Sequence, residues 1–121
     1  MIEFDFDSNR PIYIQLVEQL ELYIISGKIP PGERLPSVRD LAVLAKVNPN
    51  TMQRALTELE EMKLITTERT NGKFVTENSK LIAKHREKYA NQTIKNFFQN
   101  MQDLGFDYET TINYINQGGK L

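Results

Sequence analysis

The chain has 121 residues, 40% of them hydrophobic, and no cysteine, so disulfide bonds and thiolate metal sites are excluded. This length allows one modest core and a small extension that needs a partner. The net charge of −1 argues mildly against a nucleic-acid partner, because DNA affinity comes largely from Lys and Arg. An acidic N-terminus unlike a signal peptide, and the lack of a long apolar stretch, predict a cytoplasmic protein that makes no membrane contact.

The charges are unevenly distributed along the chain. Acidic residues collect in the first residues and between positions 58 and 61, whereas residues 34–54 and 63–73 are richer in cations. This sparse positive patch predicts modest nonspecific DNA binding and a stronger reliance on specific contacts or dimerisation. Its cations are Arg34, Arg39, Lys46, Arg54, Lys63, Arg69 and Lys73.

The N-terminal third predicts an extended segment, a helix and a rigid connector. Residues 2–6 alternate apolar and acidic side chains, which is typical of a short strand or an extended arm. Apolar residues then recur at helical spacing from Pro11 until Gly27, so we expect a helix from Pro11 to Ser26. The two prolines of residues 29–32 exclude regular helix there.

Two short helices with clear N-terminal caps follow. Ser37, with Asp40 three residues later, predicts a helix that ends near Ala45. Asn48 is a good N-cap and Pro49 suits the first helical position, so a second helix is expected, ending near Lys63. Its outward face is polar and carries Asn50, Gln53, Arg54 and Thr57.

A β-hairpin is predicted next. The β-prone runs 65–68 and 73–76 flank a turn whose Asn71 and Gly72 supply the positive φ angles of a tight hairpin. Two capped helices followed by a hairpin are the order of a winged helix-turn-helix. The fold class is therefore α+β and mainly helical, with a winged helix-turn-helix over residues 1–77.

Residues 78–121 predict a small two-helix extension. A long helix is expected from Asn78 to about Leu104 and a short one from Tyr108 to Asn116. Its large apolar side chains are too many for such an appendage to bury alone, so we favour a dimerisation region over an intramolecular core or an effector pocket. The predicted dimer interface comprises Phe97, Phe98, Met101, Phe106, Tyr108 and Ile112.

The polar helix face is the candidate reader of DNA bases. Asn and Gln can pair with adenine, Arg with guanine, and Thr can contact thymine methyl groups or phosphates, which fits Asn50, Gln53, Arg54 and Thr57. The alternative is an ordinary solvated face, which becomes less favoured once the flanking helix and hairpin are considered.

Two further groups are candidates for DNA contact. Ser37 and Arg39 stand at a helix N-terminus, where backbone donors also attract phosphate, although Arg39 could equally form a surface salt bridge. Asn71, Gly72 and Lys73 at the wing could enter the minor groove or touch phosphate. A plain hairpin turn explains Asn-Gly but leaves the nearby Arg69 and Lys73 without a role.

Catalysis has little support in the sequence. His85 is the only histidine, so a histidine metal cluster or a Ser-His-Asp triad cannot form within one chain, and we expect a surface position on the long helix. Glu60 and Glu61 diverge by about 100° on a helix, and a glycine-rich phosphate loop is missing. We expect neither enzyme activity nor a cofactor.

Three segments closely resemble the GntR superfamily of bacterial transcription regulators. They are PIYIQL at residues 11–16, GKIPPGERLPSVRDLA at residues 27–42 and VNPNTMQRA at residues 47–55. The short two-helix C-terminus resembles the YtrA-like subfamily. The resemblance implies a homodimer assembled by its C-terminal helices, which binds a palindromic operator as a repressor, often of a transporter operon.

The resemblance also implies roles for individual residues. Ser37 and Arg39 fall where the second helix meets the DNA backbone, and Gly72 falls in the wing. The start of the recognition helix is matched by Asn48, Pro49, Asn50, Thr51 and Gln53. Many relatives carry Arg at the positions of Pro49 and Gln53, so two cationic contacts are missing from this chain.

Two alternative functions remain open. The winged helix could serve as a protein-interaction module, which would suit the weak net charge. The chain could also be a ligand-gated sensor with a pocket between its C-terminal helices, for a small molecule that the sequence does not identify.

Overall fold

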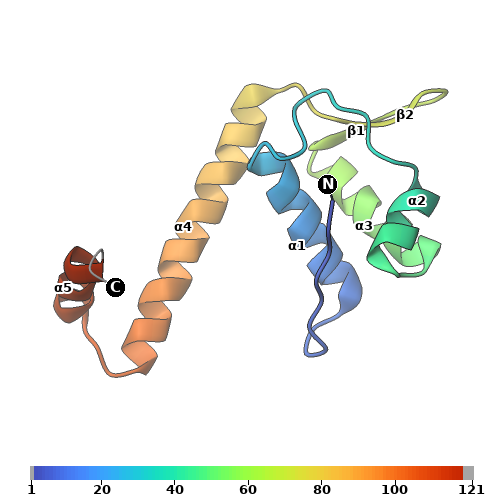
Figure 1. The fold of residues 1–121 in the computed structure, drawn as a ribbon. Helices are drawn as coiled ribbons and strands as arrows, with labels where there is room; N and C mark the ends of the chain where they lie inside the picture. Colours follow the sequence, from blue (N-terminus) through green and yellow to red (C-terminus); the bar gives the residue numbers. More distant parts are fainter. Residues whose placement is uncertain (1, 119–121) are drawn as a thin grey trace. The chain divides into compact units, whose positions relative to one another are not determined.

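A computed structural model describes residues 2–118, which fall into two compact units, Met1–His85 and Arg86–Leu121 (Figure 1). The first unit holds three helices, a two-stranded sheet and the first turns of a fourth helix. The elements in chain order are α1 (Ile12–Ile25), α2 (Val38–Ala45), α3 (Pro49–Glu61), β1 (Ile65–Glu68), β2 (Gly72–Val75), α4 (Ser79–Asp103) and α5 (Tyr108–Gln117). The mainly helical winged helix-turn-helix class is thereby confirmed.

The core of the first unit lies between α1 and α3, with α2 packed on α3. The apolar stripe of α3 that the sequence predicts is buried, and Met52 and Leu56 have no exposed surface. Leu16 and Leu20 of α1 are equally buried. Burying each such side chain contributes about 1.5 to 3 kcal/mol, so this helix pair is the platform on which the other elements rest.

Local side-chain caps fix the starts of α2 and α3, as predicted. The Ser37 hydroxyl accepts a hydrogen bond from the Asp40 N–H at 3.1 Å, and the Asn48 side chain accepts one from the Asn50 N–H at 2.7 Å. Lys46 ends α2 in the left-handed conformation, with φ of 57°, which turns the chain into α3. These two helices and their short turn form the helix-turn-helix.

The hairpin differs from the prediction in its turn. The register pairs Ile65 with Val75 and Glu68 with Gly72, so three residues form the turn and β2 begins one residue earlier than expected. Of the turn pair, only Gly72 has a positive φ, +97°; the prediction that Asn71 also adopts one was wrong. A register set by strand pairing across the sheet overrode the local Asn-Gly signal.

The connector between α1 and α2 is hydrogen-bonded to β2. The Leu35 N–H donates to the Lys73 carbonyl at 2.8 Å, and the Val75 N–H donates to the Glu33 carbonyl at 2.9 Å. Arg34 forms an isolated bridge with Phe74 between these two bonds. Residues 33–35 therefore extend the two-stranded wing by a short third edge.

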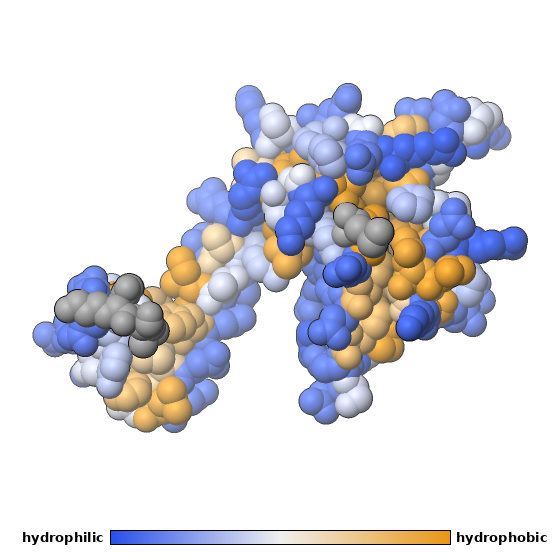
Figure 2. Space-filling model, in the orientation of Figure 1, coloured by the Kyte–Doolittle hydropathy of each residue, from blue (hydrophilic) through white to orange (hydrophobic). Residues whose placement is uncertain are grey.

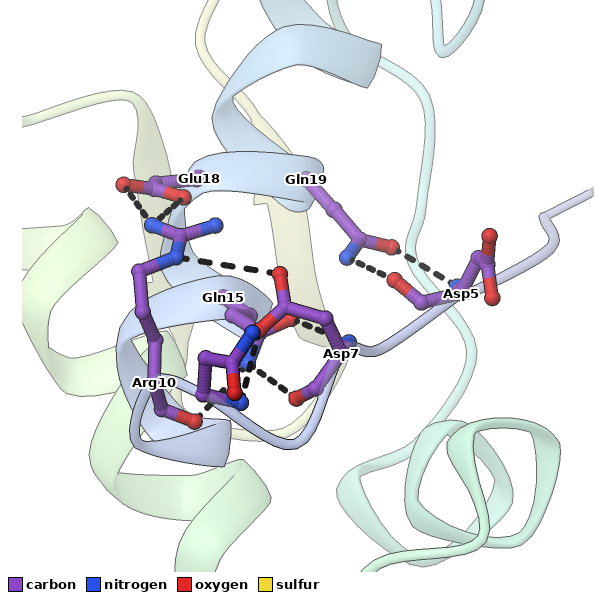
Figure 3. Close-up of polar contacts among 7 residues, drawn as sticks. Asp5, Asp7, Arg10, Gln15, Glu18 and Gln19 are labelled. Carbon is purple, nitrogen blue, oxygen red and sulfur yellow. Dashed lines mark hydrogen bonds and ion pairs between the residues drawn. The ribbon is translucent and has the colours of Figure 1, made fainter.

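The N-terminal residues form an extended arm along α1, not a strand. Their backbone groups pair with α1 side chains spaced four residues apart, Gln15, Gln19 and Tyr23. The Gln15 amide accepts from the Asp7 N–H and donates to the Asp7 carbonyl, both at 2.9 Å, and the Gln19 amide brackets Asp5 in the same way (Figure 3). The alternate side chains Ile2, Phe4 and Phe6 pack against the core.

The start of α4 belongs to the first unit. Ile82 is buried in its core, and the ring of His85 lies 3.3 Å from the Glu21 carboxylate of α1. The His85 side chain is 19% exposed, so the expectation of a surface position was wrong. That expectation failed because Glu21 and His85 are far apart in the sequence and come into contact only when α1 packs against the start of α4.

The second unit contains the rest of α4 and α5. Asp107 caps α5 by accepting a hydrogen bond from the Thr110 N–H at 2.8 Å, and this bond lowers the pKa of the Asp107 carboxyl. Thr111 is its one fully buried residue among those described. Figure 2 shows apolar side chains gathered on the visible face of this unit. In the described part of the chain, no helix is both long and apolar enough to cross a membrane.

Candidate nucleic-acid interface

The N-terminus of α2 presents an unpaired cation. Arg39 is exposed, and its side chain forms no ion pair or hydrogen bond with any residue from 2 to 118. The salt bridge that the sequence left open for Arg39 is therefore not formed within this part of the chain. The hydroxyl of Ser37, two residues earlier, accepts the capping bond from the Asp40 N–H. The free guanidinium at a helix N-terminus is suited to phosphate.

The outward face of α3 presents amide and hydroxyl groups. Asn50, Gln53 and Thr57 are all exposed, while Thr51 is half-buried. The Gln53 amide donates to the Thr57 hydroxyl at 3.3 Å, and that hydroxyl donates to the Gln53 carbonyl at 2.9 Å. Because the Thr57 hydroxyl donates to the backbone carbonyl of Gln53, these bonds orient the Gln53 side chain along the helix and leave its side-chain oxygen Oε1 available. The arrangement suits an amide that reads one base edge.

Arg54 has a partner within the fold that the sequence did not reveal. Its guanidinium carbon lies 3.8 Å from the centre of the Tyr13 ring of α1. The Tyr13 hydroxyl in turn donates to the Glu58 carboxylate at 3.0 Å. Arg54 therefore contacts α1, although it lies one turn after Asn50 on the same face of α3.

Lys73 of the wing is also engaged within the fold. Its ammonium forms an ion pair with Glu60 of α3 and donates to the Thr67 hydroxyl at 3.0 Å. Burial raises the pKa of the Glu60 carboxyl, but the hydrogen bonds from Lys73 and Thr67, with the charge of Lys73, lower it further than burial raises it. The statement that a plain turn leaves Lys73 without a role was thus wrong, because Lys73 ties β2 to α3.

The remaining wing residues surround the turn. The Asn71 amide donates to the Glu68 carboxylate at 3.2 Å. A Cβ atom placed on Gly72 would lie 3.3 Å from Nε of Arg34, a residue that the sequence placed in the positive patch but not in the site. No local pattern could have revealed this contact, because Arg34 and Gly72 approach each other only after β2 pairs with the connector.

The residues predicted to form a dimer interface are only partly covered in the second unit. Tyr108 is 71% exposed and Phe97 is 40% exposed, although the Phe98 ring stacks on Tyr108 with centroids 5.3 Å apart. Met101, Phe106 and Ile112 are half-buried. A groove of about 540 Å³ lies beside them, lined by Lys95, Phe98, Gln99, Gln102, Phe106, Asp107, Tyr108 and Thr111. The part of the chain that is described contains no cluster of metal-ligating side chains.

A helix-turn-helix with a polar outward face, followed by a two-stranded wing, defines the class of winged helix DNA-binding proteins. Residues 12–75 match the family described as bacterial regulatory proteins, gntR family. The chain therefore belongs to the GntR family of DNA-binding transcription regulators, which are not enzymes.

Individual relatives extend the similarity beyond the winged helix. The uncharacterized HTH-type transcriptional regulator YhcF of Bacillus subtilis is 34% identical over 110 residues, 91% of each chain. The HTH-type transcriptional repressor YtrA of the same organism is 42% identical over 80 residues, which cover 66% of this chain and 62% of YtrA. The solved structure of a GntR family regulator from Listeria monocytogenes is 39% identical, with a TM-score of 0.85 over 93% of this chain and 98% of that one.

Proposed function

We propose that this protein is a homodimeric repressor that binds a palindromic operator of a bacterial operon. The observation that carries the proposal is the exposed face of α3, with Asn50, Gln53 and Thr57 outward, next to the unpaired Arg39. The first three supply base contacts and Arg39 supplies a phosphate contact. Repression is supported by the similarity to the transcriptional repressor YtrA. We place the site of action in the bacterial cytoplasm.

Dimerisation is supported by the exposed apolar side chains of the second unit. Contiguous apolar surface on a small protein commonly marks an interface, and a C2 dimer presents two recognition helices to two half-sites. We expect half-sites about one helical turn apart, roughly 10 base pairs or a little more. The resemblance to the YtrA-like subfamily points to a transporter operon as the target.

The proposal is tested by selecting bound fragments from the source genome and measuring affinity for a selected fragment and a scrambled copy. Sedimentation of the protein with and without DNA gives the stoichiometry. We expect tight binding of one dimer to a symmetric sequence. Equal affinity for both duplexes, or one chain per site, would contradict the proposal, and failure to bind genomic fragments even at low salt would favour a protein-interaction module.

The groove of about 540 Å³ in the second unit favours a second candidate, a regulator gated by a small molecule. Its lining combines aromatic rings with Lys95, Gln99 and Gln102, which suits a ligand with both apolar and polar parts. A thermal-shift screen of metabolites on the full chain tests this function. A hit that raises the melting temperature and lowers DNA affinity supports gating, and a screen without hits leaves the constitutive regulator as the better description.

A further inference from the structure

The structure brings an unpaired arginine to the side of the wing. Arg34 lies on the connector, outside both the helix-turn-helix and the hairpin, yet its guanidinium lies across Gly72 of β2. We propose that Arg34 is a further DNA-contacting residue, which binds a backbone phosphate beside the wing. This inference rests on the proposed DNA-binding function and adds a residue to it.

The backbone on both sides of Arg34 is fixed to β2. The bonds from the Leu35 N–H to the Lys73 carbonyl and from the Val75 N–H to the Glu33 carbonyl enclose Arg34, which itself bridges to Phe74. These bonds to β2 therefore fix the position of the Arg34 backbone, from which the side chain extends. A residue placed in this way moves with the wing when the wing meets DNA.

Gly72 leaves room for the guanidinium. A Cβ atom at this position would lie 3.3 Å from Nε of Arg34, which is tighter than an ordinary contact, and 3.5 Å from Nη2, which is an ordinary van der Waals contact. The absence of a side chain at Gly72 therefore suits both the positive φ of the turn and the close approach of Arg34. Arg34 is held against the turn that was predicted to approach DNA.

The charge of Arg34 is available, whereas that of Lys73 is not. Lys73 is paired with Glu60, and the Asn71 amide is bonded to Glu68. Arg34 is exposed, and its side chain makes no ion pair or hydrogen bond with residues 2–118. A planar guanidinium with unused N–H donors matches the oxygen atoms of a phosphate group. Arg34 therefore supplies the wing contact that the sequence assigned to Lys73.

The test measures the salt dependence of binding to a random-sequence DNA duplex of about 30 base pairs, long enough for two half-sites. Arg34→Ala should weaken binding several-fold and reduce the slope of log K against log salt by about one. Arg34→Lys should retain most of the slope. Arg34→Gln removes the charge but keeps the long side chain, so it repeats the measurement if the alanine variant folds poorly.

Lys84→Ala is the matched control, because it removes one exposed cation from α4 in the same unit. If both Arg34→Ala and Arg34→Gln bind DNA with the affinity and slope of Lys84→Ala, the inference is overturned while the proposed function stands, provided that the unmodified protein binds. If the unmodified protein binds neither this duplex nor a selected genomic fragment at any salt concentration, both fail. Thermal unfolding of every variant, followed by circular dichroism, confirms that folded proteins are compared.

Discussion

The guanidinium of Arg54 on α3 stacks on the ring of Tyr13 on α1, 3.8 Å from its centre. At an exposed site such a cation–π contact stabilises by about 0.5 to 1 kcal/mol. The contact also separates the polar residues of α3 into two sets. Arg54 and Glu58 contact α1 through Tyr13, whereas Asn50, Gln53 and Thr57 are exposed and make no contact with Tyr13.

This separation predicts different effects for two neighbouring substitutions. Arg54→Ala should lower the free energy of unfolding by about 0.5 to 1 kcal/mol, through loss of the stacking, and leave base preference unchanged. Gln53→Ala should leave stability nearly unchanged but relax the preference at one base pair, by about 1 to 3 kcal/mol. Urea unfolding and in vitro selection measure the two effects. A relaxed base preference in Arg54→Ala would show that Arg54 reads DNA after all.

Arg39→Ala should weaken binding to operator and scrambled DNA alike. Its guanidinium has no partner within the described residues, so its loss removes a phosphate contact without destabilising the fold. The slope of log K against log salt should fall by about one. Titrations at several salt concentrations check this, with Lys84→Ala as control. An unchanged slope would exclude the phosphate role.

The Glu60–Lys73 ion pair predicts a dependence of stability on pH. The folded-state pKa of Glu60 lies below its ordinary value of 4.5, so the contribution of the pair is fully present above that pH and is lost as the pH falls through the lowered pKa. Glu60→Gln should therefore be less stable than the unmodified protein at neutral pH and should converge with it in acid. The measurement is thermal unfolding across this pH range. Glu61→Gln, exposed on the same helix, is the control, and a similar effect in both variants would argue against a specific pair.

The contacts of the N-terminal arm with α1 indicate that Gln15 and Gln19 contribute unequally to the free energy of unfolding. Gln15 is 1% exposed. Its side-chain amide accepts a hydrogen bond from the Asp7 N–H and donates to the Asp7 and Arg10 carbonyls (Figure 3). Gln15→Leu should cost about 1 to 3 kcal/mol, because these backbone groups lose their partner in a part-buried place. Gln19→Leu, whose bonds to Asp5 are solvent-exposed, should cost less. Urea unfolding measures the free energy of unfolding of both variants. Equal losses of stability would contradict the role given to the burial of Gln15.

The proposed dimer is tested by substituting Tyr108, the most exposed aromatic residue of the predicted interface. Tyr108 is 71% exposed, so Tyr108→Glu should leave the chain folded but shift sedimentation towards the monomer, because a carboxylate is costly to bury in an interface. Operator affinity should fall with it. Asn113→Glu, on the same helix and also exposed, is the control for added charge. If neither substitution changes the molecular mass in solution, these helices do not form the interface.

Features that depend on neighbouring residues were predictable from the sequence. The caps at Ser37 and Asn48 act within two or three residues, and the proline at position 49 acts on its own backbone, so both short helices begin where expected. The apolar stripe of α3 followed from helical periodicity alone. These local rules were enough to give the class of fold and the outward face of the recognition helix.

Features that depend on distant residues were not predictable. Tyr13 meets Arg54, and Glu60 meets Lys73, only after helices and strands have packed. The contacts of the N-terminal arm with α1 also depend on distant residues. Their one sequence signal is the spacing of Gln15 and Gln19, which lie four residues apart on α1. Burial and pairing decide which polar side chains remain free for DNA, and local sequence patterns do not show them.

The bonds between the connector and β2 have a consequence for the energetics of DNA binding. The backbone N–H of Leu35 is bonded to Lys73 of the wing, and Ser37, the N-cap of α2, lies only two residues further on. A strain placed on the wing by DNA therefore reaches the N-terminus of α2 through a short, hydrogen-bonded stretch of backbone. Substitutions at Gly72 and at Ser37 should then be thermodynamically coupled, with a combined effect on operator affinity that differs from the sum of the separate effects.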